Sequence, residues 1–281
     1  MVQRTLTIVA DLIAFPPADW LSGYGVHIPV HTRENYTLID FHMTPSPNSK
    51  KIKIALEELG ADHETKKYSI QDGEHLTPEF RAISPNLKLP TIVDDKPDDG
   101  GEPISVFESG AILIYLAEKH DRFLPKELRP RMAALQWLTW QVAGLGPMMG
   151  QAGHFLRYAP KNIDHSYSFE RYLNESRRLV RVLDNRLKRC EFLAGDEYSV
   201  ADMATWPMVT DGSPFLQIDL AGEYPNVRRW ADTIRARPSI QRMIDSPEFA
   251  PGPEYELKRE LTEEQFSNNF GENLMKAVVE D

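Results

Sequence analysis

The sequence contains very little cysteine: Cys190 is the only one among 281 residues. A single cysteine cannot form a disulfide within the chain, and it excludes both CxxC redox motifs and cysteine-based zinc sites. This usage suits a reducing compartment, so we predict a cytoplasmic protein. His27 and His31 are four residues apart, but Pro29 lies between them and prevents a shared helix face, so we expect no metal site.

Long apolar runs and an excess of positive charge are also missing. No segment approaches the roughly 18 consecutive apolar residues that a membrane helix requires, so we expect no membrane insertion. The formal net charge is −10, and an acidic chain repels nucleic acid, so we expect no nucleic-acid partner. What remains is a chain with 41% hydrophobic and 26% charged residues, which is the composition of a globular protein.

The first part of the chain alternates strand and helix patterns. Residues 36–41 and 64–70 are β-prone and predict two strands. Between them, apolar residues recur at helical spacing and polar residues lie mostly opposite. The apolar stripe is Ile52, Ala55, Leu56 and Leu59, and the polar face includes Lys50, Lys51 and Lys53. Gly60 suits the end of this helix.

A short helix, a hairpin and a longer helix follow in the sequence. Residues 78–83 predict the short helix, and residues 91–94 and 104–107 predict two strands. The segment between these strands is rich in turn residues, so we expect antiparallel pairing. Ser109 can cap a helix that runs to His120. The order of elements is compatible with a thioredoxin-like fold.

Beyond about residue 124 the strand patterns disappear. Long helical stripes predict an all-helical unit, with a capped helix start at Ser199-Val200-Ala201-Asp202 and a helix break at Gly144-Leu145-Gly146-Pro147. We predict an N-terminal arm (1–35), a thioredoxin-like α/β domain (36–124), an all-α domain (129–245) and an acidic C-terminal extension (246–281). The sequence leaves open whether the extension packs against the rest of the chain or frays.

Pro90 stands directly before the third predicted strand. Thioredoxin-like folds bind extended thiol peptides beside a cis-proline, and Pro90 has the matching position. A cis Leu89–Pro90 bond would turn the backbone of Leu89 outward, where it could pair with an extended ligand.

Several motifs occur together and in order between about residues 36 and 245. Among them are Ser46-Pro47-Asn48, Ile83-Ser84-Pro85-Asn86, Lys88-Leu89-Pro90, Gly101-Glu102-Pro103, Phe107-Glu108-Ser109-Gly110 and Glu170-Arg171-Tyr172. This set resembles the glutathione S-transferase superfamily, and within it the bacterial Nu class of glutathione-dependent disulfide-bond oxidoreductases. The resemblance implies a homodimer that uses glutathione as co-substrate, either to reduce disulfides or to conjugate small electrophiles in detoxification.

The resemblance also implies a glutathione-binding set. Ser109 begins a helix whose backbone N–H groups suit the γ-glutamyl carboxylate, and Glu108 can pair with the γ-glutamyl ammonium. Leu89, beside Pro90, would offer its backbone to the cysteinyl residue. Lys88 and His75 are expected near the glycine end of glutathione, although His75 stands where the family has glutamine. Arg171 is expected in the cleft.

The turn before the first helix differs from the typical Nu-class pattern. That class shows Thr-Pro-Asn, whereas this chain has Thr44-Pro45-Ser46-Pro47-Asn48. Aligning Asn48 puts Ser46 at the threonine position and leaves Thr44 in an inserted dipeptide. Either hydroxyl could donate to a thiolate, and the Asn48 amide adds a second donor. We favour Ser46 and Asn48 as catalytic residues, with Thr44 as the alternative.

Two other functions remain compatible with the sequence. One is a glutathione-dependent lyase or ether-cleaving enzyme that acts on a bulky aromatic substrate. The other is a non-catalytic protein that binds glutathione or another ligand on the same scaffold. The motifs do not identify the second substrate, and they do not say whether one or two glutathione molecules bind.

Overall fold

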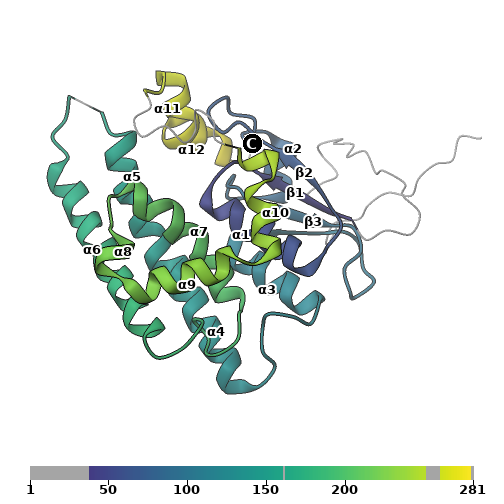
Figure 1. The fold of residues 1–281 in the computed structure, drawn as a ribbon. Helices are drawn as coiled ribbons and strands as arrows, with labels where there is room; N and C mark the ends of the chain where they lie inside the picture. Colours follow the sequence, from purple (N-terminus) through teal and green to yellow (C-terminus); the bar gives the residue numbers. More distant parts are fainter. Residues whose placement is uncertain (1–37, 161, 251–259, 280–281) are drawn as a thin grey trace, which may run out of the picture.

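The computed structural model describes residues 38–160, 162–250 and 260–279. The predicted N-terminal arm and the start of the first predicted strand lie outside these ranges. Figure 1 shows a layer of strands on one side of the molecule and a group of helices on the other. No helix of the described ranges is long and apolar enough to cross a membrane.

The strands form one mixed sheet in the order β2-β1-β3-β4. They are β1 (Ile39–Met43), β2 (His63–Lys67), β3 (Thr91–Asp94) and β4 (Ile104–Phe107). β1 pairs in parallel with β2 and antiparallel with β3, and β3 pairs antiparallel with β4, as the turn-rich connection predicted. The sheet confirms the thioredoxin-like prediction. The predicted second strand ends too late, because the chain leaves the ladder after Lys67.

Three helices accompany the sheet: α1 (Pro47–Leu59), α2 (Pro78–Ile83) and α3 (Ser109–Lys119). Gly60 ends α1 with φ of 64°, a left-handed conformation that glycine adopts without steric cost. Ser109 is not the cap of α3, as the sequence suggested, but its first helical residue. The capping position belongs to Glu108, whose side chain makes no capping hydrogen bond.

The polar face of α1 is not solvated. Lys51 and Lys53 are only 2% and 7% exposed. The reason is tertiary, because α1 packs against α3 and also against α7 and α10 of the helical part. A helix that is covered on more than one side buries residues that its amphipathic pattern alone would place at the surface.

The second part of the described chain is helical, which confirms the all-α prediction. Its elements are α4 (Leu128–Trp140), the π-helix η1 (Gln141–Leu145), α5 (Gly146–Arg157), α6 (Ser166–Leu187), α7 (Val200–Phe215), α8 (Leu220–Glu223), α9 (Pro225–Arg235), α10 (Pro238–Ile244) and the 3₁₀ helix η2 (Pro247–Phe249). The predicted capped start is confirmed at α7, where Ser199 and Asp202 form a reciprocal capping box.

The predicted helix break at residues 144–147 is wrong. The chain stays helical there, with a π-helical turn before α5, and Gly146 has a helical φ of −58°. Pro147 lies in the first turn of α5, where its missing N–H is tolerated, and the wider π turn accommodates the junction. Glycine and proline therefore reshape this helix without ending it.

One hydrophobic core joins the sheet to the helical part. Phe41, Ile52 and Ile112 from the first part belong to the same buried cluster as Leu138 and Val209 from the second. The two parts therefore bury apolar surface against each other and hold one fixed arrangement around the site.

The last described segment of the C-terminal extension, residues 260–279, is packed. It forms two short helices, α11 (Glu263–Phe270) and α12 (Glu272–Val278), which lie beside α5 and α2 in Figure 1. Asn268 donates to the carbonyl oxygen of Gln71 at 2.9 Å. The Phe270 ring lies 4.7 Å from that of His154 on α5. These helices thus contact both parts of the protein.

Candidate active site

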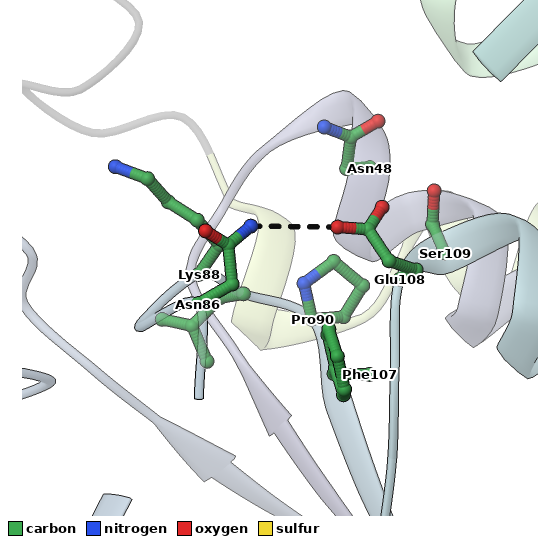
Figure 2. Close-up of a pocket in the computed structure, with 8 residues that line it drawn as sticks. Asn48, Asn86, Lys88, Pro90, Phe107, Glu108 and Ser109 are labelled. Carbon is green, nitrogen blue, oxygen red and sulfur yellow. Dashed lines mark hydrogen bonds between the residues drawn. The ribbon is translucent and has the colours of Figure 1, made fainter. Parts of the chain in front are cut away.

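A pocket of about 220 Å³ lies beside the N-termini of α1 and α3, where β3 begins and β4 ends. It is lined by Asn48, Asn86, Lys88, Leu89, Pro90, Phe107, Glu108 and Ser109. Figure 2 shows Asn48, Asn86 and Glu108 around a common space above Pro90. The structure therefore brings together the predicted residues Asn48, Lys88, Leu89, Pro90, Glu108 and Ser109.

The loop before β3 forms one wall of the pocket. The Leu89–Pro90 peptide bond is cis, as the sequence suggested. Ser84 supports this loop, because its hydroxyl donates to the carbonyl oxygen of Lys88 at 3.0 Å. Leu89 and Pro90 both line the pocket, so a ligand there meets the backbone that the cis bond presents.

Glu108 has an unusual backbone for its residue type. Its φ is 69°, in the left-handed region that residues other than glycine seldom occupy. Asn86 donates to its carboxylate at 3.4 Å, the contact drawn in Figure 2. Such strain is often retained at functional sites. Here it accompanies a carboxylate that lines the pocket and can accept hydrogen bonds from a cationic group.

The N-terminus of α3 also faces the pocket. In the described structure no side chain caps this helix, so the first backbone N–H groups lack the usual side-chain acceptor. Ser109, the first residue of α3, adds a hydroxyl, and the residue as a whole is 8% exposed. An uncapped helix N-terminus with a neighbouring hydroxyl is suited to a carboxylate.

The N-terminus of α1 is arranged differently. Ser46 caps it, because its hydroxyl oxygen accepts a hydrogen bond from the backbone N–H of Ser49 at 3.2 Å. The same hydroxyl donates to the Ser49 hydroxyl at 3.3 Å. Asn48, one residue into the helix, lines the pocket, whereas Ser46 and Thr44 are not among the lining residues. Contact of either hydroxyl with a thiol stays a prediction.

His75 is buried near Lys88 but is not one of the lining residues. It is 2% exposed, and its Nδ1 atom has no hydrogen-bond partner. Burial, and to a smaller extent the charge of Lys88, lowers the pKa of His75 to about 4. The imidazole is therefore neutral at pH 7, and among the lining residues the cationic side chain is that of Lys88.

The structure does not bring Arg171 to this pocket. Arg171 lies on α6, and its side chain is 57% exposed. Its guanidinium is 3.9 Å from the carboxylate of Glu175, one helical turn further along. A solvated ion pair on a helix face contributes little to stability, and its predicted binding role remains untested.

Three residues of the site were not predicted. Asn86 and Phe107 line the pocket, and the motifs next to Lys88 and Glu108 already contained them. Lys51 lies behind the pocket, where its ammonium group donates to the hydroxyl of Ser109 at 3.2 Å and to the side-chain carbonyl of Gln141 at 2.8 Å. No sequence signal indicated that contact, because both partners are distant along the chain.

Metal binding has no evident location in this part of the molecule. Within the described ranges, no cluster of three or more histidine, cysteine, aspartate or glutamate side chains could hold a metal ion.

Comparison with protein-family models gives two matches. Residues 45–119 match the N-terminal domain of glutathione S-transferases, and residues 148–238 match the C-terminal domain. The first match contains all eight lining residues of the pocket.

Two curated relatives are similar over most of their length. The disulfide-bond oxidoreductase YfcG of Escherichia coli is 50% identical over 74% of this chain and 94% of its own length. The disulfide-bond oxidoreductase YghU of the same organism is 41% identical over 70% of each chain.

Solved structures show the same similarity. A glutathione transferase from Burkholderia graminis, with two glutathione molecules bound per subunit, has a TM-score of 0.70 and 40% identity over 74% of this chain and 88% of its own. A glutathione transferase from Pseudomonas putida, with one glutathione disulfide bound per subunit, has a TM-score of 0.69 and 39% identity over 74% of this chain and 91% of its own.

Proposed function

The chain belongs to the glutathione S-transferase family, and on that basis we propose that it is a Nu-type, glutathione-dependent disulfide-bond oxidoreductase. The observation that carries this proposal is the pairing of the uncapped α3 N-terminus with the Glu108 carboxylate in one pocket. These two groups complement the carboxylate and the ammonium that share the α-carbon of the γ-glutamyl residue.

Placing the γ-glutamyl residue at the α3 N-terminus determines the other contacts that we propose for glutathione. Ser109 would donate its hydroxyl to the γ-glutamyl carboxylate, and Glu108 would accept from the ammonium. Leu89 would present its backbone to the cysteinyl residue. Lys88 would attract the glycine carboxylate by charge. This order leaves the cysteine sulfur close to the N-terminus of α1.

The Asn48 amide would stabilise the sulfur as a thiolate. A donor at a helix N-terminus lowers the pKa of a thiol, because both the hydrogen bond and the helix dipole favour the anion. Ser46 or Thr44 would supply a further hydroxyl donor. The protein's own Cys190 is not a lining residue, its thiol donates to the carbonyl oxygen of Arg186, and burial raises its pKa. The reacting sulfur would therefore come from glutathione.

The chemistry is thiol–disulfide exchange in two steps. The glutathione thiolate attacks one sulfur of a substrate disulfide, forms a mixed disulfide and releases the other sulfur as a thiolate. A second glutathione thiolate then attacks the mixed disulfide, and glutathione disulfide and the remaining substrate thiol leave. Related structures with two glutathione molecules or one glutathione disulfide bound support this sequence.

The test is an assay of glutathione disulfide production from glutathione and a small dialkyl disulfide. We expect turnover by the wild type and a large loss in the double variant Ser46→Ala plus Asn48→Ala. Unchanged turnover of the double variant with every active substrate would refute the proposed activation of the thiol. Tight glutathione binding without any turnover would instead identify a ligand-binding protein.

We further propose a cytoplasmic homodimer with a role in detoxification of electrophiles or disulfides. β4 is an edge strand, and its Ile104 is 40% exposed. Leu128 and Met132 on α4 are 75% and 45% exposed. A second copy would cover such apolar side chains. Sedimentation should give a dimer for the wild type and a smaller species for Met132→Glu, and a wild-type monomer would contradict the proposal.

A further inference from the structure

We propose that Lys51 positions the γ-glutamyl carboxylate of glutathione, acting through the hydroxyl of Ser109 without touching the ligand itself. This inference rests on the proposed function, since it assumes that glutathione occupies the pocket. It adds a charged residue from behind the pocket, which the lining residues do not include.

The first argument concerns the direction of the Ser109 hydroxyl proton. The Lys51 ammonium is 3.2 Å from the Ser109 oxygen and 2.8 Å from the side-chain oxygen of Gln141. An ammonium group can only donate, so it occupies an acceptor site of the Ser109 oxygen. The single proton of the hydroxyl is then free to point away from Lys51, towards an acceptor in the pocket.

The second argument concerns how firmly Lys51 is held. Lys51 is 2% exposed, and Gln141, in the π-helix η1, is completely buried. Gly146 leaves room for Gln141, because a Cβ atom at Gly146 would lie 2.9 Å from the Gln141 side-chain nitrogen. The position of the ammonium group is therefore set by packing at the boundary between the two parts of the protein.

The third argument is that Lys51 lacks a carboxylate partner. Other nearly buried lysines have one: Lys119 pairs with Asp94, and Lys53 lies 3.4 Å from Glu57. Among the described residues, no carboxylate comes within ion-pair distance of Lys51, whose hydrogen-bond partners are both neutral. A buried cation without a directly paired carboxylate is unfavourable, and Lys51 also lies beside the positive end of the α3 dipole.

A carboxylate of a bound ligand would stabilise the buried charge of Lys51. An anion at the α3 N-terminus would interact favourably with the Lys51 ammonium, with only the Ser109 hydroxyl between the two charges. Burial lowers the pKa of Lys51 to about 7, and the charge of Glu108 opposes that shift in part. The groups that accept hydrogen bonds from Lys51, Ser109 of α3 and Gln141 of η1, are neutral, so the Glu108 carboxylate beside the N-terminus of α3 is the charged group that acts on it. A carboxylate bound at the α3 N-terminus would favour the charged form of Lys51 and so oppose the lowering of its pKa.

The test compares two ligands on two variants by calorimetry at pH 6.5. The ligands are S-methylglutathione, which removes thiol ionisation, and the corresponding analogue that lacks the γ-glutamyl α-carboxylate. We expect Lys51→Met to lower the affinity for S-methylglutathione about 10- to 100-fold, as for a lost charge-assisted hydrogen bond, and to leave the decarboxylated analogue nearly unaffected. Lys53→Met is the matched control, a buried lysine on the same helix, and should leave the ratio of the two affinities unchanged.

A second measurement needs no variant. In the wild type, the affinity for S-methylglutathione should fall as the pH rises from 6.5 to 8.5, because deprotonated Lys51 no longer polarises Ser109, whereas the decarboxylated analogue should show no such fall. Equal losses of both ligands in Lys51→Met, or parallel pH profiles in the wild type, would overturn the role of Lys51. Absence of any binding of S-methylglutathione to the wild type would instead overturn the proposed function.

Discussion

Two helix N-termini meet at the pocket, and they differ in whether a side chain accepts a hydrogen bond from their first backbone N–H groups. α1 begins with Pro47, and the Ser46 side chain accepts from the N–H of Ser49. α3 begins after Glu108, with φ of 69° and no side-chain cap. The α1 N-terminus is therefore capped by the neighbouring Ser46, whereas the α3 N-terminus has backbone N–H groups available to a ligand.

The difference separates two tasks within one pocket. A capped N-terminus gains stability from its cap and presents a side chain, here Asn48, to the ligand. An uncapped N-terminus forgoes that stability and offers backbone N–H groups and dipole to an anion. We therefore propose that the γ-glutamyl carboxylate of glutathione binds at α3 and the sulfur at α1, and variants at Glu108, Asn48 and Ser46 can test this division.

The largest effect is expected at α3 from Glu108→Ala. Loss of the partner of the γ-glutamyl ammonium should lower kcat/KM for disulfide reduction about 100-fold, in line with roughly 3 kcal/mol for a charged hydrogen bond. Steady-state kinetics with varied glutathione measures it. Glu118→Gln, further along α3 and paired with Arg131, is the control. A loss of kcat/KM below about threefold in Glu108→Ala would contradict binding of the γ-glutamyl residue at the α3 N-terminus.

A smaller effect is expected at α1 from Asn48→Ala. Loss of one amide donor should raise the pKa of bound glutathione and lower kcat about tenfold, or roughly 1.4 kcal/mol, with little change in KM. The ultraviolet absorbance of the thiolate, followed against pH, reports the pKa directly. If KM rises and the thiol pKa stays constant, Asn48 binds glutathione but does not activate it.

The next variant separates the two roles of Ser46. Ser46→Ala should lower the free energy of unfolding by about 1 kcal/mol, because the cap is lost, and should also lower turnover severalfold. Ser46→Asp keeps a capping oxygen and should restore stability without restoring turnover, since a carboxylate cannot donate to a thiolate. Thr44→Ala should change neither. Full turnover by Ser46→Ala would show that Ser46 only caps α1, and Thr44 would then be the remaining candidate for the hydroxyl donor.

The smallest effect is expected at His75. Because its pKa is about 4, the ring is neutral at pH 7, and His75→Gln should leave the pH profile of turnover between 6 and 8 unchanged. Its folded-state pKa lies below the ordinary value of 6.5, so the unfolded chain binds more protons and stability falls as the pH drops from 6.5 towards 4. His75→Gln should make urea unfolding less sensitive to pH in that window. A changed turnover profile would show that His75 does titrate in the enzyme.

Much of the fold was predictable because its signals are local. The spacing of apolar residues in residues 52–59, the glycine at position 60 and the turn-rich segment before β4 each describe a few neighbouring residues. The capping box at Ser199 is equally local. The helix break at residues 144–147 failed for the opposite reason. Whether glycine and proline end a helix or reshape it depends on the helices packed against them, here those around η1 and α5.

The site was predictable where the motif itself lines the pocket. Lys88-Leu89-Pro90 and Glu108-Ser109 do so, and so does Asn48. Arg171 was matched in the same way, yet it lies on an exposed face of α6, because a motif match carries no information about how helices are placed. His75 was expected near the glycine end of glutathione, but it is not a lining residue, and its burial lowers the pKa of the ring to about 4.

The sequence by itself determined the order of the strands, the family and six of the eight residues that line the pocket, because each depends on short stretches of chain. Only the tertiary structure decided that Lys51 lies behind Ser109, 58 residues away in the sequence, and that Asn86 meets Glu108, 22 residues away. The physical reason is burial. A lysine on the polar face of a helix is solvated or buried according to what packs over that face; here α1 packs against α3, α7 and α10, and Lys51 contacts Ser109 of α3 and Gln141 of η1.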